Sequence, residues 1–116
     1  MTDKALTRSL ECTLPGIDGL REITVSIGAP ERDPASGGDF RVLVEITGFD
    51  SPCSKYFHGV DAIQAMMMGL WIVPDLVRSL AGRGARVTWL GNEDLGFRYG
   101  EHLTDEAGAG NNDMPP

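Results

Sequence analysis

Three side chains that could do chemistry lie within a short stretch of the sequence: Cys53, His58 and Asp61. A thiolate, an imidazole and a carboxylate can hold a metal ion, and a cysteine beside a histidine can act as an activated nucleophile. Their spacing follows no established ligand rule, and three such groups on a loop and a helix start are common by chance. We therefore predict no metal site, no cofactor and no catalytic residue, and only the tertiary structure can show whether the three groups meet.

Asp61 and Gln64 are a second candidate, because we expect a helix to begin between His58 and Val60. Free backbone amides at a helix N-terminus, together with two polar side chains, could orient a ligand. The simpler interpretation gives Asp61 a capping role in which its carboxylate accepts from those amides. The candidate ligand-binding residues are therefore Asp61, Gln64 and His58, beside a predicted loop over residues 29–39.

Strong catalytic signatures do not occur in this sequence. It has no phosphate-binding loop, no Gly-x-Ser-x-Gly elbow, no His-Glu-x-x-His and no Cys-x-x-Cys. The two histidines, His58 and His102, are far apart in the chain. These observations weigh against an enzyme.

A single long helix is predicted over residues 59–81, where apolar residues recur at three- and four-residue steps. The recurring positions predict one face that packs on a sheet: Val60, Ile63, Met67, Leu70, Pro74, Val77 and Ala81. Proline cannot donate to the preceding turn, so Pro74 predicts either a kink or two abutting helices. Gly82 and Gly84 end the helix.

Strands are predicted over residues 5–14, 20–28 and 40–47, where apolar and polar residues alternate, and over residues 85–90 after the helix. Arg8 is the exception on the apolar side of the first strand. Residues 29–39 and 48–58 are expected to be loops. The strand-strand-strand-helix-strand order predicts an α+β fold, with an antiparallel sheet of three to four strands covered on one face by one long, Pro-kinked helix.

Apolar residues surround more than half of this helix between residues 65 and 74, which is more than one sheet can cover. The surplus side chains predict an interface with another chain: Met66, Met68, Trp71 and Ile72. The run Met66-Met67-Met68 would suit an adaptable binding surface, although packing in the core and interface is the simpler interpretation. We expect a homodimer, since pairing also protects open sheet edges.

The chain has 116 residues and a net charge of −7, typical in length of one domain. Residues 93–116 carry six acidic side chains and one basic side chain, so the negative charge is concentrated at this end. We expect a domain over residues 1–100 and a flexible acidic tail over residues 101–116. Without clustered basic residues, a signal-peptide pattern or a long apolar run, we expect no nucleic acid, no membrane and a cytoplasmic protein.

The segment Gly59-Val60-Asp61-Ala62-Ile63-Gln64-Ala65 resembles a motif of a family of small bacterial proteins of unknown function. Members of that family have strands first, a helix that opens with Gly-Val-Asp-x-x-Gln-Ala, a short strand and a Gly-Phe pair, here Gly96-Phe97. The resemblance covers roughly residues 40–97, and the methionine-rich helix and Pro74 depart from it. It implies a fold and a bacterial cytoplasmic origin, and it implies no reaction.

Two functions remain open at this point. The first is a non-enzymatic protein-interaction module, of which an immunity or antitoxin-like inhibitor is one concrete version. The second is a small-ligand binding protein or enzyme with its site near the start of the helix.

Overall fold

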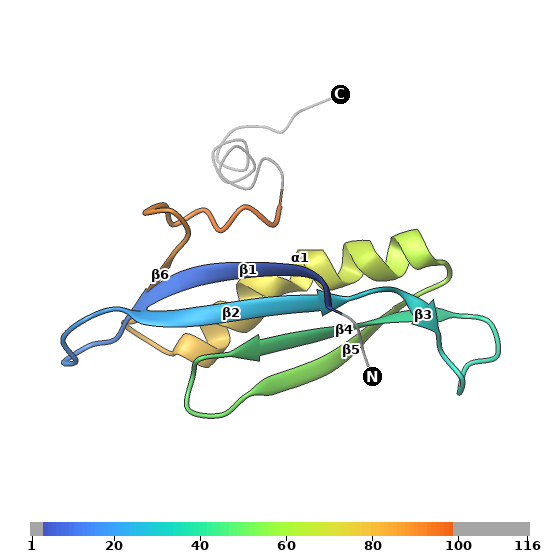
Figure 1. The fold of residues 1–116 in the computed structure, drawn as a ribbon, viewed down its shortest axis with the longest axis horizontal. Coiled ribbons are helices and arrows are strands. Elements are labelled where there is room, and N and C mark those ends of the chain that lie inside the picture. Colours follow the sequence, from blue (N-terminus) through green and yellow to red (C-terminus); the bar gives the residue numbers. More distant parts are fainter. Residues whose placement is uncertain (1–3, 99–116) are drawn as a thin grey trace, which may run out of the picture.

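The computed structural model describes residues 4–98, which form an antiparallel sheet with one long helix packed against it (Figure 1). The strands are β1 (Lys4–Thr13), β2 (Arg21–Gly28), β3 (Glu31–Arg32), β4 (Phe40–Thr47), β5 (Cys53–Gly59) and β6 (Arg86–Thr88), and helix α1 (Ala62–Ala81) comes between β5 and β6 in the chain. The predicted α+β class is confirmed. The predicted acidic tail over residues 101–116 lies outside the described residues.

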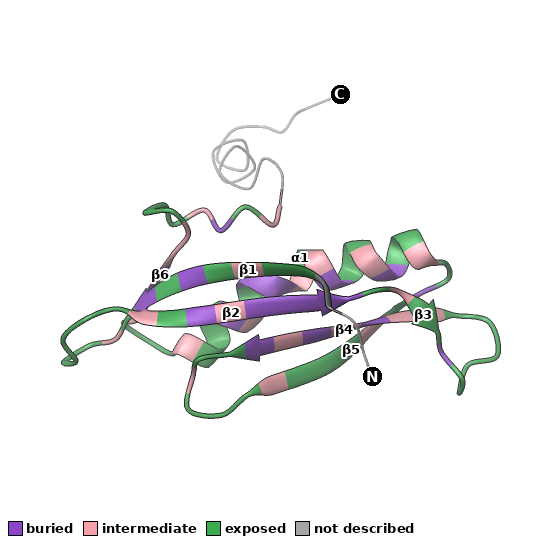
Figure 2. Cartoon of the chain, in the orientation of Figure 1, coloured by how far each residue is buried: buried purple, intermediate pink, exposed green. Residues whose placement is uncertain are grey.

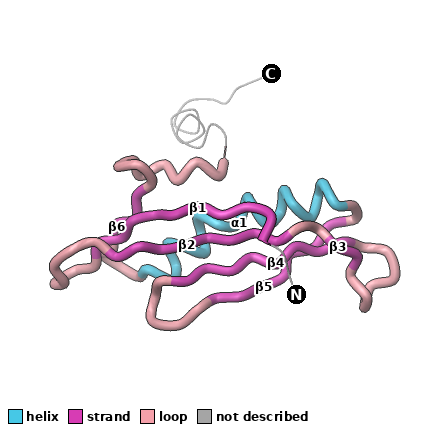
Figure 3. Tube along the Cα trace, in the orientation of Figure 1, coloured by secondary structure: helices cyan, strands magenta, loops and turns pink. Residues whose placement is uncertain are grey.

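The sheet has the spatial order β6, β1, β2, β4, β5, and all neighbouring strands are antiparallel (Figure 3). Strand β3 lies on the same edge of β4 as β2. It pairs with Phe40 and Arg41 at the start of β4, whereas β2 pairs with the second half of β4. Within residues 4–98 the sheet therefore has six strands in place of the three to four expected.

Both additional strands fall in stretches that the sequence predicts to be loops. Strand β5 lies at the edge of the sheet, and most of its side chains are exposed; only Cys53, Phe57 and Gly59 are turned away from solvent. An edge strand of this kind shows no apolar alternation, so the sequence contains no strand signal. Its backbone hydrogen bonds to β4 define it, and these become visible only in the tertiary structure.

The core lies between the sheet and α1, and strands β1, β2 and β4 supply most of it (Figure 2). Alternate residues of these strands point to the helix side, as period-two patterning requires. The buried strand residues are Leu10, Cys12, Ile23, Val25, Ile27, Val42, Val44 and Ile46. The helix contributes Ala65, Val73, Pro74 and Val77, with Gly69 at the closest approach.

The helix is rotated relative to the sequence-based prediction. Val60, Ile63 and Met67 were expected on the core face, but all three are exposed, whereas Ala65 and Gly69 face the sheet. The reason is the close approach of α1 to β4: a Cβ at residue 69 would come within 2.7 Å of Val42 Cγ2. Small residues permit this contact, so the predicted face is wrong over the first half of the helix. Over the second half it is correct: Pro74 and Val77 are buried, and Leu70 and Ala81 pack against the core.

Helix α1 continues through Pro74 without a break, so residues 62–81 form one helix and not two abutting ones. Proline has no N–H to donate and its ring crowds the preceding turn, but the flanking turns of this helix are held by the core residues Val73 and Val77. No helix in the described part of the chain is long and apolar enough to cross a membrane.

The two cysteines differ in burial, and this difference predicts a difference in reactivity. Cys12 is buried in the core and Cys53 is half-buried on the edge strand. Burial raises the pKa of the Cys12 thiol, and the positive charge of Arg21 offsets only part of that shift. Since the thiolate is the reactive form, we expect iodoacetamide to alkylate native Cys53 well before Cys12, as followed by peptide mass spectrometry. Equal rates in the native protein, and not only in denaturant, would contradict this burial.

Candidate functional site

A cluster of polar side chains lies at one end of the sheet, on the face opposite the helix. It consists of Glu31, Asp33, Arg41, Tyr56 and His58, and we refer to it as the polar cluster. Arg41 on β4 and His58 on β5 are opposite each other in the sheet register. The Nε of Arg41 donates to Oε2 of Glu31 at 2.7 Å, and its guanidinium lies 4.0 Å from the centre of the Tyr56 ring.

Asp33 is the least accessible member of the polar cluster, since only 10% of its side chain is exposed. One carboxylate oxygen lies 3.1 Å from Nε2 of His58, and the other lies 3.8 Å from Nη1 of Arg41 and accepts from the Ala35 amide at 3.0 Å. The Asp33 amide also donates to the carbonyl of Asp39 at 2.8 Å. Asp33 therefore anchors the hairpin between β3 and β4 to strand β5.

The contact between His58 and Asp33 joins two parts of the predicted ligand site, because Asp33 belongs to the 29–39 stretch. A histidine oriented by a carboxylate can accept or donate a proton at its other nitrogen. Within residues 4–98, however, Asp33 is the only hydrogen-bond or ion-pair partner of the His58 side chain. The arrangement thus pairs His58 with one carboxylate.

Asp61 and Gln64 form a reciprocal cap at the N-terminus of α1. The Asp61 carboxylate accepts from the Gln64 amide at 2.8 Å, and the Gln64 side-chain oxygen accepts from the Val60 amide at 2.7 Å. Such a capping box satisfies amides that the helix itself leaves free. Within residues 4–98, neither residue makes a hydrogen bond or ion pair to His58 or to the rest of the polar cluster. A ligand-binding role for Asp61 and Gln64 remains a prediction.

The capping box predicts a modest and measurable loss of stability. Asp61→Ala removes the side-chain acceptor and should lower the free energy of unfolding by about 1 kcal/mol, as measured by urea denaturation. Gln64→Ala should have a smaller effect, since it removes only the reciprocal bond to Val60. Asp61→Ser is the matched control, because serine caps helices about as well as aspartate. A loss for Ser equal to that for Ala would show that capping is not the main role of Asp61.

Cys53, His58 and Asp61 do not converge. Cys53 and His58 lie at opposite ends of β5 and pair with Ile46 and Arg41 respectively, while Asp61 caps the helix. Among residues 4–98, no group of three histidine, cysteine or acidic side chains is placed to hold a metal ion.

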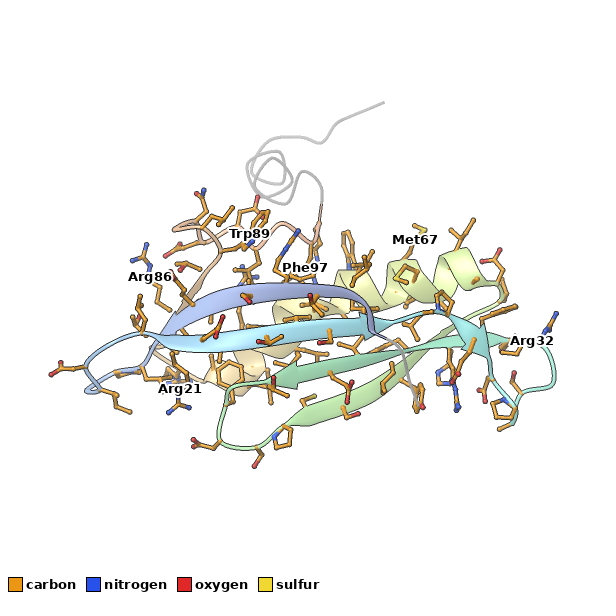
Figure 4. All side chains as sticks on the ribbon, viewed as in Figure 1. Arg21, Arg32, Met67, Arg86, Trp89 and Phe97 are labelled. Atoms are coloured by element: carbon orange, nitrogen blue, oxygen red, sulfur yellow. The ribbon has the colours of Figure 1, made fainter. Side chains whose placement is uncertain are left out.

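Exposed apolar side chains follow the outward side of α1 and the residue Val60 just before it, and we define them as the stripe: Val60, Ile63, Met67, Met68 and Trp71. Ile63, Met67 and Trp71 follow one another at four-residue steps, and their exposed fractions are 73%, 63% and 59%. Figure 4 shows Met67 pointing away from the sheet. Of the predicted interface residues, Met68 and Trp71 lie on this stripe, whereas Met66 and Ile72 are half-buried.

A second element besides α1 covers the inner face of the sheet: the segment of residues 89–98, which we call the strap. Two arginines hold its C-terminal half. Arg8 on β1 donates from Nη1 to the carbonyls of Leu95 and Gly96 at 2.9 and 3.1 Å. Arg98 donates to the carbonyl of Trp71 at 2.7 Å and to Asp75 at 2.8 Å. The strap therefore bridges β1 and the helix.

The sequence contained one sign of the strap, which is Arg8. It pairs with Val25 in the sheet, so its side chain starts from the inner face among apolar neighbours. Its guanidinium lies 3.8 Å from the centre of the Trp89 ring and 4.8 Å from that of Phe97, and Figure 4 shows these two rings above β1. An arginine on the apolar side of a strand needs such partners, and the sequence alone could not identify them.

Comparison with known proteins identifies a family and no known structure. No solved structure matches the chain. The model of one family, described as a domain of unknown function (DUF6968), matches residues 6–99. These residues include all of the described sheet from Leu6 onward, the helix and the strap. The chain therefore belongs to the DUF6968 family.

Proposed function

We propose that this protein is a non-enzymatic interaction module that binds a second copy of itself through the apolar stripe of α1. The observation that supports the proposal is the exposure of large apolar side chains on consecutive turns of one helix. Soluble monomers seldom expose contiguous apolar patches of this kind unless the patch binds something. Met67 and Met68 add flexible side chains that can adapt to a partner surface.

The charge distribution favours a second copy as the occupant. Residues 62–74 contain no charged side chain, so the middle of the stripe presents nothing that would attract a charged partner. The same apolar stripe on another copy is a complementary surface, with the Arg98 guanidinium, 4.6 Å from the centre of the Trp71 ring, at its end. In an antiparallel two-fold arrangement, Ile63 of one copy faces Trp71 of the other, and Met67 lies near the axis.

The composition of the stripe is also that of an interface centre. Specific interfaces bury about 800 Å² per partner and concentrate aromatic residues and methionine at their core, with polar residues at the rim. Trp71 and the two methionines supply that core, and Gln64 and the Asp75–Arg98 ion pair lie at its edge. A helix-to-helix dimer of this kind leaves the polar face of the sheet exposed.

Light scattering on the full chain tests the proposal. The unmodified protein should have the mass of a dimer at micromolar concentration, and Met67→Glu should have the mass of a monomer because it places a charge at the interface centre. Met68→Glu should weaken the dimer less, since Met68 lies toward one side of the stripe. Leu20→Glu is the matched control: Leu20 is 65% exposed and lies outside the helix.

A monomeric unmodified protein would overturn the homodimer. So would a dimer that survives Met67→Glu with its native circular dichroism spectrum. If the protein is a monomer and co-purifies with one basic protein at equal stoichiometry, the homodimer is wrong. The interaction module would then be of the antitoxin-like kind, with that basic protein as its partner.

A small-ligand site at the polar cluster is the second candidate, favoured by the contact between His58 and Asp33. We rank it second because the charges of Glu31, Asp33 and Arg41 already pair with one another. Inorganic phosphate is the simplest probe, since His58 and Arg41 both donate to anions. If the polar cluster binds anions, phosphate should raise the melting temperature of the unmodified protein, and His58→Asn should abolish that rise. If phosphate does not raise the melting temperature of the unmodified protein, a site for anions of this class is eliminated.

A further inference from the structure

A hollow of about 210 Å³ opens between the helix and the strap, on the inner face of the sheet. Its floor consists of Val25 and Ile27 of β2, and its walls include Leu70 of α1 and Gly96 and Phe97 of the strap. Leu6 lies at its edge and is half exposed. Apart from Arg8, the side chains that line it are almost all apolar.

The one charged residue that lines this hollow has no counter-ion in the described structure. Arg8 uses Nη1 for the two strap carbonyls and lies against the faces of Trp89 and Phe97. Within residues 4–98, no carboxylate lies within ion-pair distance of Arg8, and neither Nε nor Nη2 has a hydrogen-bond acceptor. Three N–H donors of a positive charge therefore remain available beside an apolar surface.

We propose that the hollow binds a small monocarboxylate with a short apolar tail. A carboxylate would accept from the remaining donors of Arg8, which is the charge-assisted contact that a guanidinium favours. The tail would lie against Leu6 and Leu70. At about 210 Å³ the hollow has room for a short carboxylic acid, and hexanoate is the probe that we choose.

The chemistry of the hollow sets the expected selectivity. An alcohol of the same length offers the same tail but no negative charge, so it gains the apolar contacts alone. Acetate offers the charge but almost no tail. Both should bind at least tenfold more weakly than hexanoate if the guanidinium and the apolar walls act together. The source that we favour is a free carboxylic acid, since the hollow is too small for a lipid with two chains.

Nuclear magnetic resonance titration of the full chain tests this site with hexanoate, 1-hexanol and acetate as probes. Hexanoate should give saturable shifts in the methyl signals of Leu6 and Leu70 and the ring signals of Phe97, with unchanged signals of Met67 on the stripe. Arg8→Gln keeps a hydrogen-bonding side chain and removes the charge, so it should abolish the preference for hexanoate over 1-hexanol. Leu70→Trp, which narrows the hollow and leaves the charge of Arg8 in place, should weaken both probes.

Three results would overturn the site. They are the absence of saturable shifts with hexanoate, shifts that centre on the stripe, and a preference for hexanoate that persists in Arg8→Gln. Repeating the titration with Met67→Glu separates this site from the homodimer, because the hollow should bind hexanoate equally in either oligomeric state.

Discussion

Gly59→Ala is expected to lower the free energy of unfolding by about 3 kcal/mol, although it adds a single methyl group. A Cβ at residue 59 would come within 2.4 Å of the Ala65 amide nitrogen and 2.7 Å of the Gln64 carbonyl carbon. These are backbone atoms of the first helical turn, so they cannot rotate aside as the end of a side chain can. The end of β5 and the start of α1 would have to separate, and the capping box between Gln64 and Val60 would be strained.

The matched control is Gly38→Ala in the hairpin between β3 and β4. A Cβ there meets no atom within 4 Å, and its backbone is not in the left-handed region, so this change should be close to neutral. Urea denaturation of the two variants at equal protein concentration gives the comparison. If Gly59→Ala lowered the free energy of unfolding no more than Gly38→Ala does, the end of β5 would not pack tightly against the helix.

Arg8→Ala is expected to release the strap and to lower the free energy of unfolding by about 2–3 kcal/mol. The change removes both bonds to the carbonyls of Leu95 and Gly96, and it removes the cation from between Trp89 and Phe97. Leu95 is the one fully buried residue of the strap, and Trp89 and Phe97 pack only partly buried against the core, so Arg8 is the main polar contact between the strap and β1. Hydrogen exchange over residues 89–98 should therefore accelerate far more than exchange over β2.

Arg32→Ala is the control for this prediction, since Arg32 also lies over an aromatic ring, 5.0 Å from the centre of Phe40, but on an exposed two-residue strand. Arg32→Ala should leave hydrogen exchange in the strap unchanged. It should change the free energy of unfolding by no more than about 0.5 kcal/mol. Uniform acceleration across the sheet in Arg8→Ala would mean that Arg8 supports the whole core and does not act mainly on the strap.

Part of the candidate site could be predicted from the sequence. Asp61 and Gln64 stand three residues apart just before an apolar run, and this spacing alone indicates a helix start with a capping residue. His58 could be connected with the 29–39 stretch, and the structure brings it to Asp33. The role of Arg41 was not visible, because its contacts to Glu31 and Tyr56 depend on strand β3 and the pairing of β4 with β5.

The orientation of the helix could not be predicted, and it changes the identity of the candidate interface. Large apolar residues usually mark the core face of a helix, which is why Ile63 and Met67 were expected to be buried. Here Ala65 and Gly69 face β4 because close packing favours small residues at that contact. Of the predicted interface residues, Met68 and Trp71 are exposed, and Met67 joins them on the stripe.

By itself, the sequence determined the class of fold, the three longest strands, the single long helix with its cap, and the buried state of Cys12. Each of these depends on local periodicity or local turn chemistry, which neighbouring residues specify. Only the tertiary structure decided which face of the helix packs on the sheet, that β3 and β5 are strands, and that Arg8 holds the strap. These features arise from contacts between residues far apart in the chain, where close packing and backbone pairing outweigh local preference.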